Sequence, residues 1–168
     1  DRDLARYSNL ETATAYVSRP IIGPSIAFVF VVLAGIAALL FFGQSNNSII
    51  VVIAACLGAY MALNIGANDV ANNMGPAVGA NALTMGGAIA IAVIFESAGA
   101  LIAGGDVVST IAKGIIAPES MQTASIFIWA MMAALLSAAL WVNLATWVGA
   151  PVSTTHSVVG GVMGAGIA

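Results

Sequence analysis

A chain of 168 residues with 61% hydrophobic and only 7% charged side chains is not a soluble globular domain, because such domains have about a quarter charged residues. The mean hydropathy of +1.04 indicates an integral membrane protein. Only four residues are lysine or arginine, three of them before residue 20, so the sequence has no basic patch for nucleic acid. Because the chain starts without methionine and stops inside an apolar run, we expect it to be one piece of a longer polypeptide.

The first predicted elements are a polar segment and a membrane-spanning helix. Residues 1–20 mix charged and polar side chains without the apolar core of a signal peptide, which predicts an interfacial or loop segment. Residues 21–42 form an apolar run long enough to span about 30 Å of hydrocarbon as a helix. We therefore expect three parts, namely the polar segment 1–20, a first transmembrane helix with its turn at 21–48, and one larger unit at 49–168.

The next apolar run, residues 49–63, is too short to cross a membrane, since at 1.5 Å per residue its helix reaches only about 22 Å. It must continue into the polar residues that follow or stop midway. Helix-breaking residues punctuate that continuation, at Gly66, Gly75, Pro76 and Gly79. This pattern predicts a helix that is broken inside the membrane.

Three further segments complete the predicted architecture. Residues 82–105 are apolar with Glu96 embedded, and residues 107–118, which carry Lys113, predict a second broken or re-entrant element. Residues 124–148 span comfortably, with tryptophans near both ends as in the aromatic belts of a bilayer. The apolar runs are continuous rather than alternating, which argues against a barrel. The expected fold class is an all-α polytopic membrane protein with broken or re-entrant helices.

A polar cluster, "IGANDVANNM", occupies residues 65–74. An ionised carboxylate such as Asp69 costs about 2.5 to 3.5 kcal/mol at membrane depth, so we expect it to serve a function. If the cluster is helical, Asn64, Asn68 and Asn72 share one face, with Asp69 on the adjacent one. The alternative is that the asparagines only hold neighbouring helices together and that Asp69 is neutral or lies in a loop.

A second polar interruption, "PVSTTHS" at residues 151–157, precedes an apolar run. Hydroxyl side chains before a helix are good N-caps, so the pattern predicts the N-terminus of a half-helix. The free N–H groups and positive dipole end would make an anion site at Ser153, Thr154 and Thr155 without lysine or arginine. The alternative is ordinary capping, with His156 as a buried structural imidazole.

The two interruptions resemble a known family. They are "GANDVANNMGPAVGA" (66–80) and "GAPVSTTHSVVGGVMGAGI" (149–167), and they are similar to the paired signatures of one repeat of the inorganic phosphate transporter (Pit) family. Members of this family are sodium- or proton-coupled phosphate permeases, and each has two such repeats in inverted orientation. The resemblance covers residues 49–168 and leaves residues 21–42 outside. It implies half of an inverted-repeat transporter in the plasma (inner) membrane, and not an enzyme.

The resemblance also implies a set of site residues. Those for phosphate are Asp69, Asn72, Ser153, Thr154 and Thr155. Those for the coupling ion are Asn68, Asp69, Asn72, Glu96, Ser153 and His156, with sodium held by Asn68, Asp69 and Ser153. The implied partners are inorganic phosphate, sodium or a proton, the lipid bilayer and the second repeat, with a homo-oligomer left open and no other cofactor.

Charge balance suggests why such transport would be coupled. A phosphate anion 4 Å from an Asp69 carboxylate is repelled by about 4 kcal/mol at an effective dielectric constant of 20, and the only cation after Arg19 is Lys113. A sodium ion bridging an Asp69 oxygen, asparagine carbonyls and the carbonyls of a broken helix, or a proton on Asp69 or Glu96, would offset this repulsion. The alternatives are an ion channel and a transporter of another oxyanion such as sulfate. A hydrolase built on Ser153, His156 and Asp69 is disfavoured because no G-x-S-x-G motif is present.

Overall fold

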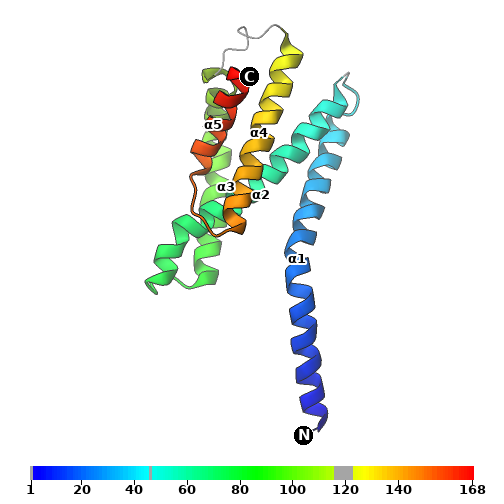
Figure 1. Cartoon of the computed structure of the whole chain (residues 1–168), viewed down its shortest axis with the longest axis vertical. Coiled ribbons are helices and arrows are strands. Elements are labelled where there is room, and N and C mark those ends of the chain that lie inside the picture. Colours follow the sequence, from blue (N-terminus) through cyan, green and yellow to red (C-terminus); the bar gives the residue numbers. More distant parts are fainter. Residues whose placement is uncertain (1, 46, 116–122) are drawn as a thin grey trace. The chain divides into compact units, whose positions relative to one another are not determined.

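The computed structural model describes residues 2–45, 47–115 and 123–168 (Figure 1). All regular elements within these residues are helical, which confirms the all-α part of the predicted fold class. They are α1 (Arg2–Phe42), α2 (Ser48–Gly79), α3 (Met85–Ser109), the π-helical turn η1 (Thr110–Gly114), α4 (Ala124–Trp147) and α5 (Thr154–Ile167). Four segments among the described residues are long and apolar enough to cross a membrane: Ile21–Phe42, Ser48–Gly79, Met85–Ser109 and Ala124–Trp147.

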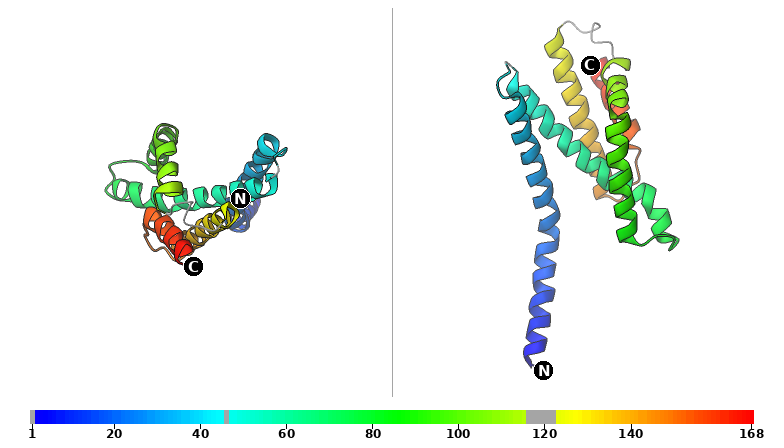
Figure 2. Two further views of the ribbon diagram at one scale, coloured as in Figure 1. Left: turned by 90° about the horizontal axis from the view of Figure 1, so that it is seen from above. Right: turned by 180° about the vertical axis from the view of Figure 1, so that it is seen from behind.

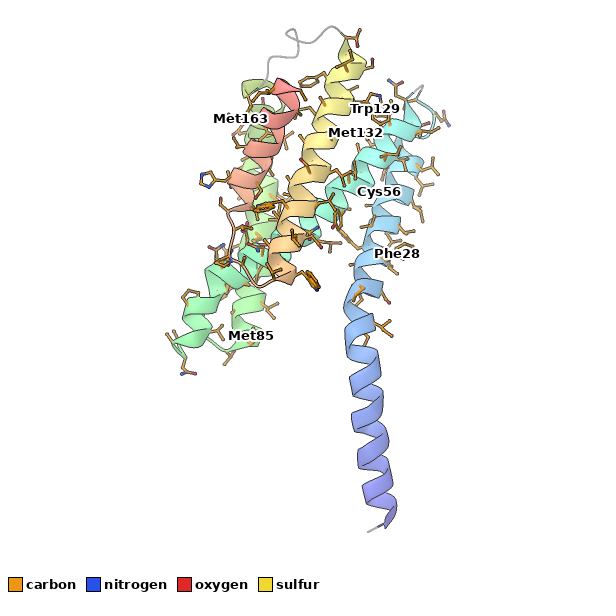
Figure 3. The ribbon with its side chains drawn as sticks, viewed as in Figure 1. Phe28, Cys56, Met85, Trp129, Met132 and Met163 are labelled. Atoms are coloured by element: carbon orange, nitrogen blue, oxygen red, sulfur yellow. The ribbon has the colours of Figure 1, made fainter. Side chains whose placement is uncertain are left out.

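The helices form two compact units, Asp1–Ala59 and Tyr60–Ala168. In the first unit α1 is followed by the start of α2, and Cys56, labelled in Figure 3, lies with its Sγ 3.8 Å from the carbonyl oxygen of Val31. A Cβ at Gly35 would lie only 2.8 Å from the same Sγ, so this glycine permits the close approach of the two helices. Cys56 is therefore a small packing residue, as its apolar surroundings in the sequence suggest.

Helix α1 begins earlier than predicted. Residues 2–20, expected to be an interfacial or loop segment, belong to the same helix as the apolar segment 21–42. The loop alternative is therefore wrong for this segment. The helix continues through Pro20 and Pro24, although each proline removes one backbone hydrogen bond.

Helix α2 is not broken, in contrast to the prediction. It runs without interruption from Ser48 to Gly79, through both the polar cluster and Pro76. The proline lies in the last turn, where the loss of one hydrogen bond is tolerated. The helix ends instead at Asn81, whose φ of 56° is left-handed; the amides of Asn81 and Ala82 bond back to the carbonyls of Val78 and Ala77 at 3.0 and 2.9 Å. This is the Schellman arrangement that closes many helices.

The second predicted break is also absent from the residues that the structure describes. Residues 107–109 are the last turn of α3, and η1 continues it to Gly114. The hydroxyl of Thr110 donates to the carbonyl of Asp106 at 2.9 Å, so the junction is bonded rather than broken. Residues 116–118 of the predicted re-entrant element lie outside the described residues.

The second unit is built around the contact of α2, α4 and α5. Met61 of α2 packs against the fully buried residues Ala139 and Val142 of α4, with Val158 of α5 at the edge of this cluster. Helices α4 and α5 lie side by side in all views (Figures 1 and 2). Gly161 explains how closely they approach, since a Cβ there would lie 2.7 Å from the carbonyl oxygen of Ala134.

This contact predicts different effects for two adjacent glycines. We expect Gly161→Ala to force α5 away from α4 and to destabilise the protein by about 1–3 kcal/mol, as overpacking usually does. Gly160→Ala is the matched control, because a Cβ at Gly160 meets nothing within 4 Å. The measurement is the midpoint of thermal unfolding of each full-length variant in detergent, and equal midpoints would contradict the packing described here.

Candidate functional site

The two signature segments meet at a single hydrogen bond within the second unit. Thr154, the first residue of α5, donates from Oγ1 to Oδ2 of Asp69 on α2 at 2.8 Å. The Thr154 side chain is 6% exposed, and Asp69 is half-buried. A carboxylate in the middle of an apolar helix therefore has a hydroxyl donor 85 residues away in the sequence.

The local sequence explains how Thr154 reaches this position. Helix α4 ends at Trp147 and is closed by Gly149, whose φ of 72° favours glycine. The amides of Gly149 and Ala150 bond back to the carbonyls of Thr146 and Ala145 at 3.2 and 2.8 Å. Pro151 follows and cannot continue the helix. The chain then runs without helix to the N-cap of α5, which turns it back along α4.

The N-terminus of α5 is capped as the sequence predicts. Ser153 is the N-cap, with extended backbone angles, and its Oγ accepts from the backbone N–H of His156 at 3.2 Å. Its carbonyl accepts from both the amide and the hydroxyl of Ser157, at 3.0 and 2.8 Å. The amides of Thr154 and Thr155 have no acceptor among the described residues, so they remain available at the positive end of the helix dipole.

The asparagines of α2 form a second feature, a ladder that follows α4. Asn64 accepts from Asn143 Nδ2 at 2.8 Å, and Asn68 donates from Nδ2 to Thr146 Oγ1 at 3.1 Å. Asn72 donates from Nδ2 to Asn68 Oδ1 at 2.8 Å and to the carbonyl of Val152 at 3.5 Å. The helical-face prediction for these three residues is thus confirmed. We call Asn64, Asn68 and Asn72 the asparagine ladder.

A pocket of about 320 Å³ lies along this ladder. Its polar lining comes from Asn68, Asn72 and Thr146, and the turn 149–151 closes one side. The pocket is thus bounded by α2, by α4 and by the turn that follows α4.

The structure separates the predicted site residues into two groups. Asn68, Asp69, Asn72, Ser153 and Thr154 come together, and Thr155 follows on the exposed side of the same helix end. Glu96 does not join them: it is exposed on α3 and makes no hydrogen bond to the ladder or to α5 within the described part of the chain. His156 contributes its backbone N–H, while its residue is exposed rather than buried, which corrects the alternative of a buried imidazole.

Two consequences follow for the predicted chemistry. The site is lined by one helix end, not two, because Asp69 lies within the intact α2, whose backbone carbonyls are engaged in the helix. A cation here must therefore use side-chain oxygens or the loop carbonyls. The hydrolase alternative loses its geometry as well, since Asp69 pairs with Thr154 and Ser153 Oγ accepts from a backbone amide.

Sequence reasoning missed two residues of α4, Asn143 and Thr146. Both lie in the predicted spanning segment 124–148, three residues apart and therefore on one helical face. This spacing of polar residues in an apolar helix was the available signal. It is the same signal that singled out the asparagines of α2.

Comparison with known proteins places these segments in a family context. The model of the phosphate transporter family matches residues 65–168, which contain both signature segments. A protein of Helicobacter pylori named "Putative phosphate permease" is 52% identical over 167 residues, covering 99% of this chain and 31% of that protein. Proteins of the same description from Mycobacterium tuberculosis and Pyrococcus horikoshii are 49% and 47% identical over 75% and 70% of the chain, and 23% and 29% of their own length.

The matches cover most of this chain but only part of each relative. The chain spans about a third, or less, of the length of these curated relatives. The match to the Helicobacter protein extends over residues 21–42, whereas the family model, like the two motifs, leaves them outside. No solved structure matches the chain.

Proposed function

The chain belongs to the phosphate transporter family, and from this premise we propose that the whole protein carries inorganic phosphate across a membrane together with a sodium ion or a proton. The observation that carries the proposal is the 2.8 Å hydrogen bond between Thr154 Oγ1 and Asp69 Oδ2, because it joins an acid to the anion-binding end of a helix. The chain is an integral membrane protein with four membrane-length helices in its described residues, in keeping with this role.

Phosphate would bind at the N-terminus of α5. The amides of Thr154 and Thr155 and the exposed hydroxyl of Thr155 supply donors for phosphate oxygens. The Thr154 hydroxyl is already engaged, since its proton points to Asp69. Thr154 therefore links the phosphate subsite to the acid, and Ser153 keeps the helix end in place through its cap.

The need for a coupling cation would follow from the absence of fixed positive charge at this site. The sequence has no lysine or arginine between residues 20 and 112 or after residue 113, so no fixed cation stands in either signature segment. A phosphate anion beside the Asp69 carboxylate is therefore repelled, by about 4 kcal/mol per unit-charge pair at 4 Å and an effective dielectric constant of 20. A sodium ion between Asp69 and the asparagine ladder, or a proton on Asp69, removes this repulsion.

The rest of the transporter remains part of the proposal. The chain covers about a third of the length of its relatives, which is in keeping with the second, inverted repeat that the motif resemblance implies. We propose that this repeat completes the site from the other side. Sulfate is the second candidate substrate, because a helix N-terminus recognises charge and shape more readily than the central atom of an oxyanion.

The test is uptake of radiolabelled phosphate by the full-length protein in liposomes. Sodium and choline media at two pH values distinguish the coupling ions, and excess unlabelled sulfate tests selectivity. We expect saturable uptake that needs sodium or an inward proton gradient and that sulfate inhibits weakly. Uptake that rises linearly with phosphate would indicate a channel, and an absence of phosphate uptake would contradict the proposal.

A further inference from the structure

The asparagine ladder has a fixed hydrogen-bond direction, which is set at its contact with α4. Thr146 Oγ1 lies 2.8 Å from the carbonyl oxygen of Val142, one turn earlier in the same helix. A carbonyl can only accept, so the hydroxyl proton of Thr146 points to Val142. Thr146 Oγ1 is left as an acceptor towards α2.

The acceptor role of Thr146 Oγ1 fixes the amide orientation of Asn68, which in turn fixes that of Asn72. Asn68 must present its Nδ2 to Thr146, at 3.1 Å, and its Oδ1 therefore faces Asn72. Asn72 must in turn present its own Nδ2 to that oxygen, at 2.8 Å. The carbonyl of Val152, 3.5 Å from the same Nδ2, requires the same orientation independently, because it too can only accept.

As a result, the amide oxygen of Asn72 is left without a hydrogen-bond donor among the described residues. Both protons of Nδ2 face acceptors, while Oδ1 receives no hydrogen bond from any residue that the structure describes. Asn72 is exposed and lines the pocket of about 320 Å³ together with Asn68 and Thr146. From these facts we propose that Thr146 is a positioning residue, which acts through Asn68 to present Asn72 Oδ1 to the coupling sodium ion.

The chemistry of Asn72 Oδ1 favours a sodium ion over phosphate or a proton as its ligand. An amide oxygen is an acceptor, so it attracts a hard cation and repels the oxygens of phosphate. It also carries no titratable proton, which favours a metal cation over a proton at this position. Because α2 is unbroken and its carbonyls are engaged, oriented side-chain oxygens such as this one must replace them as ligands. The inference rests on the proposed function and assigns Asn72 to the cation rather than to phosphate.

The experiment uses the full-length protein and measures two quantities separately. The first is equilibrium binding of radioactive sodium to the purified protein without phosphate. The second is the KM for phosphate uptake in liposomes at saturating sodium. The test variant is Thr146→Val, which replaces the hydroxyl by a methyl group and leaves the Nδ2 of the buried Asn68 without an acceptor.

Three further variants serve as controls for Thr146→Val or as its replacement. Thr146→Ser keeps the hydroxyl and is expected to retain the sodium affinity of the wild type. Ser137→Ala removes another α4 hydroxyl that bonds only to its own helix, at the carbonyl of Ala134, and is the matched control. Thr146→Ala carries the same expectation as Thr146→Val and replaces it if the valine variant does not fold.

We expect the sodium dissociation constant of Thr146→Val to rise about 10- to 100-fold, as the loss of a group that orients a metal ligand usually causes, with an unchanged phosphate KM at saturating sodium. An unchanged sodium affinity, equal rises in both constants, or a wild type that binds no sodium would overturn the inference. A wild type that binds sodium but takes up no phosphate would instead overturn the proposed function, so the two failures are distinguishable.

Discussion

Asp69→Asn in the full-length protein is expected to separate phosphate binding from its coupling. Without the carboxylate, the repulsion of about 4 kcal/mol disappears, which corresponds to about a thousandfold in affinity. Phosphate should therefore bind in choline medium almost as tightly as in sodium medium. Accumulation of phosphate against its gradient should be lost, because no cation is then required for the loaded site.

The measurement pairs equilibrium phosphate binding with concentrative uptake, each in sodium and in choline. Asp106→Asn is the matched control, since Asp106 is an exposed aspartate on α3 that undergoes the same chemical change. Glu96→Gln tests the other predicted acid, and because Glu96 is exposed and makes no hydrogen bond to the ladder among the described residues, we expect wild-type coupling. If Asp69→Asn kept the sodium or pH dependence of the wild type, Asp69 would have no part in coupling.

The second large effect is expected at Thr154. Thr154→Val is nearly isosteric and suits the buried position, but it removes the donor to Asp69 Oδ2. Leaving a partly buried charged acceptor unpaired costs about 1–3 kcal/mol, so the uptake rate should fall about tenfold to a hundredfold.

Thr154→Ser separates the hydroxyl from the rest of the side chain. It keeps the donor and is expected to recover most of the uptake that the valine variant loses. The rates are compared at equal amounts of folded protein, determined by gel filtration. Equal losses in the serine and valine variants would show that the threonine methyl group, and not the bond to Asp69, is what matters.

The order of the helices, the start of α5 and the shared face of the asparagines could be predicted from the sequence because they are local properties. Continuous apolar runs indicate the spanning helices, and hydroxyl residues after Pro151 indicate the start of α5. The periodicity of four in the asparagines correctly placed Asn64, Asn68 and Asn72 on one face. Each of these features depends on residues within about two helical turns.

The continuity of α2 could not be predicted in the same way. Gly66 and Gly75 are permissive residues rather than obligatory breaks, and Pro76 disturbs only the last turn. Which role such residues take depends on the tertiary surroundings of the helix, which the local sequence does not contain. The same limit applies to Thr146 and Glu96, because the partner of a polar side chain on another helix is a tertiary property.

The central claim is that an oxyanion site without fixed positive charge holds phosphate only when a cation binds with it. The most direct test is equilibrium binding of radiolabelled phosphate to the purified full-length protein, in sodium and in choline, at acidic and alkaline pH. The account predicts that the affinity in choline at alkaline pH is lower than in sodium by up to about a thousandfold. Equal affinity under all four conditions would contradict it.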